Sequence, residues 1–357
     1  MSASRAVSTL VRRLGLGVFI IVAASLTLLL SDWRPRSTRA GVPRVAIFQY
    51  SSNVNLDLGV RGLSDSLRDH GWIDGRTVEL HSFNAESDVG TLNSIAQEMV
   101  SGKYTHVVTV STPCLQAVAK ANRDGKVRHI FGVVADPLAA RVGISPTNPY
   151  DHPRWMVGMG TFMPVGELLE MARRLNPRLR SVGLPWNPAE ANSQAYTRVA
   201  REAARRLGLE LLEGNVENST AVGEVTESLI ARGAEAILMT GDNTVSIASD
   251  TVLACVRKAR IPAMATAPST VAHGALFSIG ADYYQVGREV GDLAARVLSG
   301  EDVATMPILY HIPKVFLINR SVPEQLKDTW VFPPDVLAQA KDVSAASPAS
   351  QTTQMRK

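Results

Sequence analysis

The stretch GADYYQVGREVGDLAARVLSGE, residues 280–301, follows a strand-like run, GALFSIG, with no intervening linker. Its apolar residues recur at three- and four-residue spacing, which predicts a helix with one buried face. Asp282 can cap the first turn, Gln285 completes a capping-box pattern, and Gly300 marks the end. An aspartate and two tyrosines, Tyr283 and Tyr284, therefore lie where a strand enters a helix. They form either a cap with two half-buried rings or part of a ligand site.

The composition excludes several classes of protein. The chain has 357 residues, of which 45% are hydrophobic, enough for one large or two medium cores. Two cysteines, Cys114 and Cys255, cannot make a disulfide scaffold or a metal cluster. The net charge is +4, and residues 1–40 contribute +5 through six arginines and one aspartate, so the rest is near −1 (4 minus 5). This balance argues against nucleic acid as a partner.

The N-terminal region carries a targeting signal. Residues 14–31 contain no charged side chain and follow a basic start, which is typical of a signal peptide or a membrane anchor. We assign residues 1–40 to this leader, and both readings place the rest of the chain outside the cytoplasm. A cytoplasmic body on a reversed anchor is the alternative. No cysteine follows the apolar run, which excludes a lipoprotein anchor.

The remainder alternates short β-branched runs with amphipathic helical stretches in two series. Such alternation predicts mainly parallel sheets with helical crossovers, hence an α/β protein with two doubly wound parallel-sheet lobes. The Pro- and Gly-containing residues 143–160 separate the two series. The small, polar residues 336–357 predict a disordered tail.

Signatures of catalysis and of metal binding are absent from the sequence. It has no GxSxG elbow, no phosphate loop and no HExxH pair, so we expect no cofactor and no metal. Cys114 at a predicted helix start is either an activated thiol or a packed side chain, and it lacks an obvious histidine partner.

Polar clusters follow five predicted strands, at the edge where open α/β sheets bind ligands. Helix N-termini at such an edge suit a carboxylate, and aspartates there can hold a cation such as an ammonium. Each cluster alone is also a normal helix cap. The candidate site residues are Ser111, Thr112, Asp136, Asn187, Glu190, Asn192, Ser193, Asp242, Asn243, Asp282 and Tyr283.

The motifs STP (111–113), NPAEANS (187–193), GDNTV (241–245) and the opening stretch together resemble the ABC transporter substrate-binding protein family related to tryptophan-binding TrpX-type proteins. The resemblance covers about residues 44–320. It implies a type I periplasmic-binding-protein fold with two lobes, a three-crossing hinge and no catalysis. The expected lobes are residues 44–157 with 281–307, and 158–280 with 308–322. Where family members often carry an acidic residue and a histidine, this chain has Ser52 and Asn53.

The resulting hypothesis is a monomeric protein that captures a small solute, an amino acid with an apolar or aromatic side chain, for an ABC permease. The turn at Ser111 and Thr112 is expected to bind the ligand carboxylate. Asn192 and Ser193 are expected to contact the ligand from the other lobe, and Asp242, with Asp282 or Asp136, to hold its ammonium. A membrane-tethered sensor and an enzyme that uses Cys114 are the alternatives.

Overall fold

A computed structural model describes residue 25 and residues 41–344. The predicted leader, apart from Ser25, and residues 345–357 of the predicted tail lie outside the described residues. Within the described part, no helix combines the length and the apolar character needed to cross a membrane.

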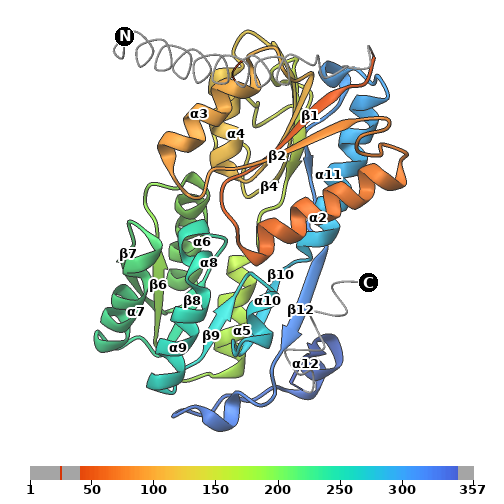
Figure 1. Cartoon of the computed structure of the whole chain (residues 1–357). Coiled ribbons are helices and arrows are strands. Elements are labelled where there is room, and N and C mark those ends of the chain that lie inside the picture. Colours follow the sequence, from red (N-terminus) through yellow and green to blue (C-terminus); the bar gives the residue numbers. More distant parts are fainter. Residues whose placement is uncertain (1–24, 26–40, 345–357) are drawn as a thin grey trace, which may run out of the picture. The chain divides into compact units, whose positions relative to one another are not determined.

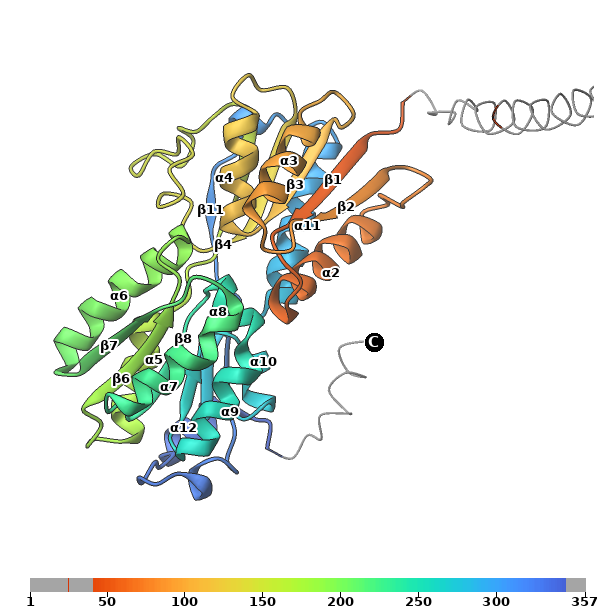
Figure 2. The same cartoon turned by 60° about the vertical axis from the view of Figure 1, so that its left-hand side comes forward.

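The first lobe is built on a six-stranded parallel sheet, ordered β11-β5-β4-β3-β1-β2 (Figures 1 and 2). Its central strands are hydrophobic and buried, as expected for a sheet that is covered on both faces. The strands are β1 (Arg44–Gln49), β2 (Glu79–Asn84), β3 (His106–Val110), β4 (Arg128–Val134), β5 (Met156–Gly160) and β11 (Leu309–Tyr310). The helices are α2 (Val54–Asp69), α3 (Val89–Met99), α4 (Thr112–Ala121) and α11 (Tyr283–Leu298), with a short 3-10 helix at Val303–Thr305.

The second lobe is built on a seven-stranded sheet, ordered β13-β12-β10-β9-β8-β6-β7 (Figures 1 and 2). This sheet is mixed, because β12 runs antiparallel to β10. The strands are β6 (Ser181–Trp186), β7 (Glu210–Asn215), β8 (Ala236–Met239), β9 (Ala263–Ala265), β10 (Phe277–Ala281), β12 (Lys314–Ile318) and β13 (Lys341–Asp342). The helices are α5 (Val165–Leu175), α6 (Ala191–Leu207), α7 (Val222–Ala231), α8 (Asn243–Ile247), α9 (Ser249–Ala259), α10 (Ser269–Ala272) and α12 (Pro334–Gln339), with 3-10 helices at Ser219–Ala221 and Pro323–Gln325.

The chain passes between the two sheets in three places: after β5, at Asp282 between β10 and α11, and between β11 and β12. Two of these crossings differ from the expected boundaries. Residues 158–160, expected in the second lobe, complete β5, because Gly160 pairs with Val134 of β4. The strand β11, also expected in the second lobe, pairs with β5 in the first.

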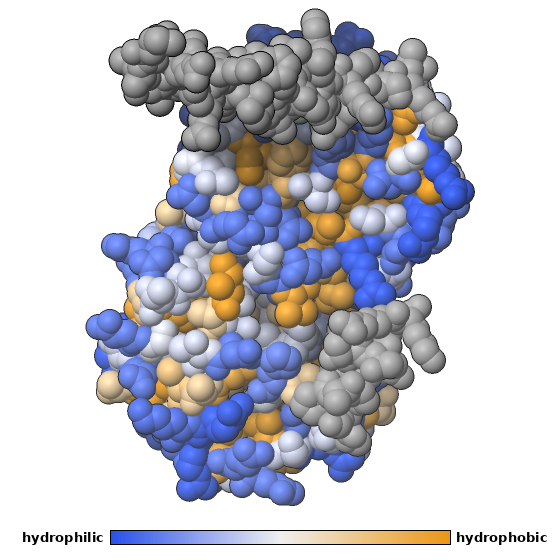
Figure 3. Space-filling model, in the orientation of Figure 1, coloured by the Kyte–Doolittle hydropathy of each residue, from blue (hydrophilic) through white to orange (hydrophobic). Residues whose placement is uncertain are grey.

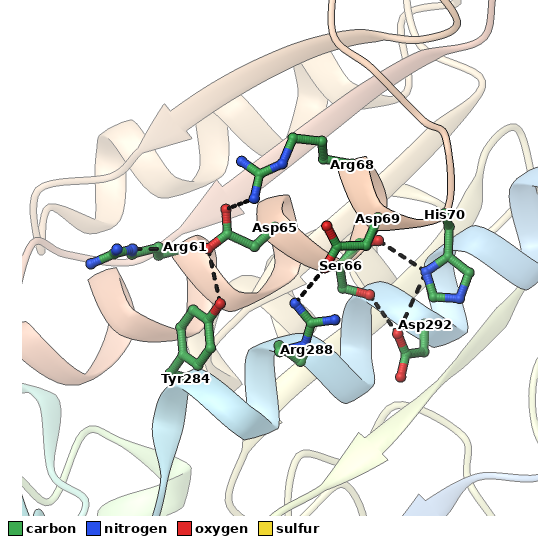
Figure 4. Close-up of polar contacts among 9 residues, drawn as sticks. All are labelled: Arg61, Asp65, Ser66, Arg68, Asp69, His70, Tyr284, Arg288 and Asp292. Carbon is green, nitrogen blue, oxygen red and sulfur yellow. Dashed lines mark hydrogen bonds and ion pairs between the residues drawn. The ribbon is translucent and has the colours of Figure 1, made fainter. Parts of the chain in front are cut away.

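The helix of the opening stretch, α11, returns to the first lobe and packs closely on α2 (Figure 4). Glycines make this approach possible: a Cβ on Gly62 would lie 2.0 Å from the Tyr284 carbonyl oxygen. Polar contacts flank the close packing. Tyr284 Oη donates to Asp65 at 3.0 Å, and Arg288 Nη1 donates to Asp69 at 2.8 Å. Tyr284 therefore fixes the helix pair and does not face the second lobe.

Residues 336–344, predicted to be disordered, are ordered in the structure, which corrects that part of the tail assignment. Val336 of α12 is buried, and β13 adds a parallel strand to the edge strand β12. The prediction failed because it rested on a small, polar composition. A two-residue strand needs only backbone groups to pair, so composition does not reveal it. On the face shown in Figure 3, hydrophobic and hydrophilic residues are interspersed, and most large apolar side chains lie inside the lobes.

Candidate ligand-binding site

A central cavity lies where the two lobes face each other. The first lobe lines it with the starts of α2 and α4 and the end of β4, and the second lobe with the starts of α6 and α8. Every residue that lines the cavity is uncharged. The lining residues are Asn53, Asn55, Leu56, Ser111, Thr112, Val133, Ala135, Thr161, Met163, Asn192, Tyr196, Gly241, Asn243, Ser246 and Tyr283.

Three buried polar atoms at this cavity have no hydrogen-bond partner within the described chain: Ser111 Oγ, Thr161 Oγ1 and Asn192 Oδ1. These residues are only 2%, 2% and 4% exposed. Buried polar groups normally find partners, because an unsatisfied one costs about 1–3 kcal/mol. The three atoms come from the first lobe, a crossing segment and the second lobe. All three therefore converge on one cavity between the lobes.

Two residues of the first lobe that line the cavity have a strained backbone conformation. Ser111, which precedes α4, has φ 115°, and Val133 near the end of β4 has φ 53°. Positive φ is unfavourable for a side chain with a Cβ, above all for a β-branched one, and costs about 1–3 kcal/mol at each such residue. Ser111 does not cap α4 with its own side chain, so its hydroxyl stays available. The first N–H groups of a helix also lack intrahelical partners.

The second lobe contributes to the cavity a hydrogen-bond network centred on Glu190 and Asp242. These are the only buried carboxylates in the part of the chain that the structure describes. Asp242 caps α8 by accepting from Val245 N at 2.8 Å. Its other oxygen accepts from Asn187 N at 2.7 Å and from Ser193 Oγ at 2.5 Å. Burial, and then the neighbouring charge of Glu190, raise the pKa of Asp242 to about 7.

Aromatic and apolar side chains form the remaining wall. Tyr196 of α6 and Tyr283 of α11 are buried, and burial raises the pKa of both phenols. Phe162 packs beside Tyr196 with ring centroids 4.8 Å apart, and Met163 lies next to it in the chain. This wall is apolar and aromatic, the kind of surface against which an apolar group packs.

Direct contacts between the lobes border the cavity. Ser269 Oγ donates to Asn55 Oδ1 at 3.3 Å, and Arg198 Nη2 lies 4.0 Å from Asp136 Oδ2. Among residues 41–344, no three histidine, cysteine or acidic side chains are grouped in a way that could hold a metal ion.

A family model described as ABC transporter substrate binding protein matches residues 44–344, which is most of the chain. The chain belongs to this family. This substrate-binding protein is thus the solute-binding component of an ABC transporter, a binding protein of the extracytoplasmic class and not an enzyme.

Several relatives share its sequence or fold. A tyrosine-binding protein of Clostridioides difficile (strain R20291) is 28% identical over 264 residues, 74% of this chain and 75% of that protein. A conserved domain protein of Vibrio cholerae is 27% identical with a TM-score of 0.79, over 84% of this chain and 99% of that one. A Streptococcus pneumonia ABC domain in complex with L-Trp has a TM-score of 0.78 at 23% identity, with the same two coverages, and shows the shared fold.

The predicted site residues of this substrate-binding protein fall into three groups. Five line the central cavity: Ser111, Thr112, Asn192, Asn243 and Tyr283. Asn187 and Glu190 line a neighbouring groove, between the two lobes beside α3 and α4. Asp136, Ser193, Asp242 and Asp282 line neither space.

Asp136, Asp242 and Asp282 do not line the cavity, because each accepts hydrogen bonds from backbone N–H groups. Asp282 caps α11 by accepting from Gln285 N at 3.1 Å, and Asp136 accepts from Leu138 N at 2.9 Å. Asp242 has both oxygens occupied within the second lobe. This geometry gives no support to an aspartate as the direct partner of an ammonium.

Sequence reasoning missed several lining residues, including Asn53, Tyr196 and Thr161. Tyr196 could have been found, because it lies four residues after Asn192 on the same face of α6. Thr161 directly follows β5, at the same sheet edge as the predicted clusters. From the sequence, Asn53 was identified only as a residue that differs from the family pattern.

Proposed function

We propose that this protein captures an amino acid with an aromatic side chain in the central cavity and delivers it to an ABC permease outside the cytoplasm. The observation that carries the proposal is the set of unpartnered atoms, Ser111 Oγ, Thr161 Oγ1 and Asn192 Oδ1, around an uncharged cavity with two tyrosines. The relative named as a tyrosine-binding protein supports the same class of ligand.

The two charged groups of an amino acid match the two edges of the cavity. The start of α4, with the free Ser111 hydroxyl and the helix N–H groups, suits the carboxylate. The second lobe carries the two buried carboxylates, so its edge has negative potential and suits the ammonium. The ligand ring then meets Tyr196, Tyr283 and Met163. Closure of the lobes about the three crossings excludes water from these contacts.

The test is titration calorimetry with a panel of ligands on protein cleared of co-purified solutes by partial unfolding and refolding. We expect L-tyrosine, L-tryptophan or L-phenylalanine to bind at least tenfold tighter than L-alanine and L-aspartate. Tighter binding of aspartate, or of a neutral sugar such as ribose, would overturn the aromatic assignment.

Residues 1–40 are proposed as the signal or anchor that carries the protein across the membrane. Mass mapping of the N-terminus of the native protein distinguishes the two forms. A mature N-terminus near Gly41 would establish cleavage, and an intact leader in the membrane fraction would establish an anchor.

A further inference from the structure

We infer that Glu190 is a positioning residue: it turns the amide oxygens of Asn192 and Asn243 toward the cavity, where they accept hydrogen bonds from the ligand ammonium. This assignment rests on the proposed function, since it requires an amino acid as the ligand.

Glu190 collects donors from both flanking segments. Its Oε2 accepts from Asn192 Nδ2 at 2.9 Å, from Asn243 Nδ2 at 2.7 Å and from Asn243 N at 3.0 Å. Its Oε1 accepts from Thr244 N at 3.0 Å and from Thr244 Oγ1 at 2.7 Å. With five donors on two oxygens, the carboxylate has little capacity left for a ligand.

These contacts decide how the two amides are oriented. An ionised carboxylate only accepts, so a flipped amide would bring its oxygen against a carboxylate oxygen at hydrogen-bond distance. Both NH₂ groups must therefore face Glu190. Asn192 also donates to the Gly241 carbonyl oxygen at 2.9 Å, which uses its donors.

The amide oxygens are left for the cavity. Both asparagines line it, and Asn192 Oδ1 is buried without a partner in the described chain. An ammonium has three donors and no acceptor, so acceptor oxygens are what it requires. The Glu190 charge lies one hydrogen bond behind them and polarises the amides in the direction that strengthens this acceptance. The site thus senses a cation without placing a charged side chain in the cavity wall.

The experiment compares two ligands that differ only in the ammonium: L-tyrosine and 3-(4-hydroxyphenyl)propanoate. Calorimetry is run with both on the wild type, on Glu190→Gln and on Glu213→Gln, a control in the same lobe whose carboxylate pairs with Arg201. A carboxamide at 190 has a single acceptor oxygen and adds two donors, so it releases the orientation of Asn192 and Asn243. We expect wild type and Glu213→Gln to prefer tyrosine at least thirtyfold. Glu190→Gln is expected to lower this preference at least tenfold, with the affinity for the propanoate changed less than threefold.

The ratio of affinities is measured on one preparation, so a partly unfolded fraction does not affect it. Equal weakening of both ligands in Glu190→Gln would show a merely structural role and overturn the inference, as would an unchanged ratio. If Glu190→Gln does not fold, the same two affinities are measured on Asn243→Ala. A preference for tyrosine within twofold of the wild-type value would then overturn the assignment. A wild type that binds neither ligand would overturn the proposed function and this inference together. A wild type that binds both ligands equally would overturn the inference alone.

Discussion

The two edges of the central cavity are built in opposite ways. The first lobe presents a strained backbone, with positive φ at Ser111 and Val133, and a hydroxyl without a partner. The second lobe presents two carboxylates, Glu190 and Asp242, that accept eight hydrogen bonds between them. Each edge leaves one polar atom at the cavity without a partner, Ser111 Oγ or Asn192 Oδ1, but only the second edge holds its side chains in a network of hydrogen bonds.

This contrast separates two tasks. Strain and an unpaired hydroxyl cost folding free energy, and a ligand at that edge recovers part of the cost on binding. The hydrogen-bond network around the two carboxylates holds its amides in one orientation, which reduces the entropy lost on binding. We therefore expect mutations in the first edge to change affinity more than stability, and mutations in the second to change both.

The largest effect is expected from Glu190→Ala. It leaves five neutral donors without their acceptor in a buried network, and because each unsatisfied buried donor costs about 1–3 kcal/mol, we expect a loss of at least about 3 kcal/mol. Urea denaturation followed by tryptophan fluorescence measures the loss, with Trp186 reporting on the second lobe. Ser111→Ala is the control in the opposite edge and is expected to cost less than about 1 kcal/mol. A loss below about 1 kcal/mol in Glu190→Ala would remove the contrast between the edges.

The second prediction concerns pH. Because the pKa of Asp242 is raised to about 7 in the fold, the folded protein holds this proton above pH 4, where the unfolded chain has released it. Its contribution to stability is therefore complete near pH 4 and is lost as the pH rises to 7. Buried His106 and His129 in the first lobe have pKa values lowered to about 4 and about 3, chiefly by burial. Their contribution has the opposite sign and is gained as the pH rises to 6.5.

The variant Asp242→Asn isolates the contribution of Asp242 to the pH dependence of stability. Urea denaturation at pH 5 and pH 7 should show that wild type loses at least about 1 kcal/mol relative to the variant over this interval, since one pKa unit corresponds to about 1.4 kcal/mol. His129→Gln serves as the control, and its difference from wild type should run in the other direction. Parallel pH profiles for wild type and Asp242→Asn would mean that Asp242 is ionised throughout.

A paired substitution at Ser111 tests the strained edge. Ser111→Gly removes the hydroxyl and relieves the strain of φ 115°, whereas Ser111→Ala removes the hydroxyl and keeps the strain. Both should weaken aromatic amino-acid binding roughly tenfold, about the value of one hydrogen bond to a charged group. Only the glycine variant should be more stable than the alanine variant, by about 1 kcal/mol in thermal or urea unfolding. Equal stability of the two variants would show that the backbone at 111 is unstrained.

The sequence predicted the two-lobe α/β fold because strand and helix periodicities are local properties. It also predicted that the strand-to-helix turns lie at the carboxyl edges of the sheets, and the cavity contains residues from all five of those turns. The sequence could not show whether Asp242 caps a helix or contacts the ligand, because both roles call for an aspartate at the start of a helix. The orientation of Asn243 was likewise hidden, since it depends on a contact with Glu190 across 53 residues of the chain. The return of α11 to the first lobe came from the family resemblance and not from its periodicity.

The smallest effect is expected where the two edges touch directly, at Arg198 and Asp136. Their charged atoms lie 4.0 Å apart, and the side chains are 62% and 21% exposed, so solvent screens the pair. Exposed pairs of this kind are worth about 0.2–1 kcal/mol. Arg198→Ala should thus weaken aromatic amino-acid binding no more than about fivefold, and the difference should shrink at 0.5 M salt. Arg201→Ala is the matched control on the same helix, because its partner Glu213 lies in the same lobe, and it should leave the affinity unchanged. If Arg198→Ala weakens ligand binding by well over fivefold and the loss persists at high salt, this ion pair holds the two edges together. A ligand that bridges the cavity would then contribute less to closure of the lobes than the contrast between the edges implies.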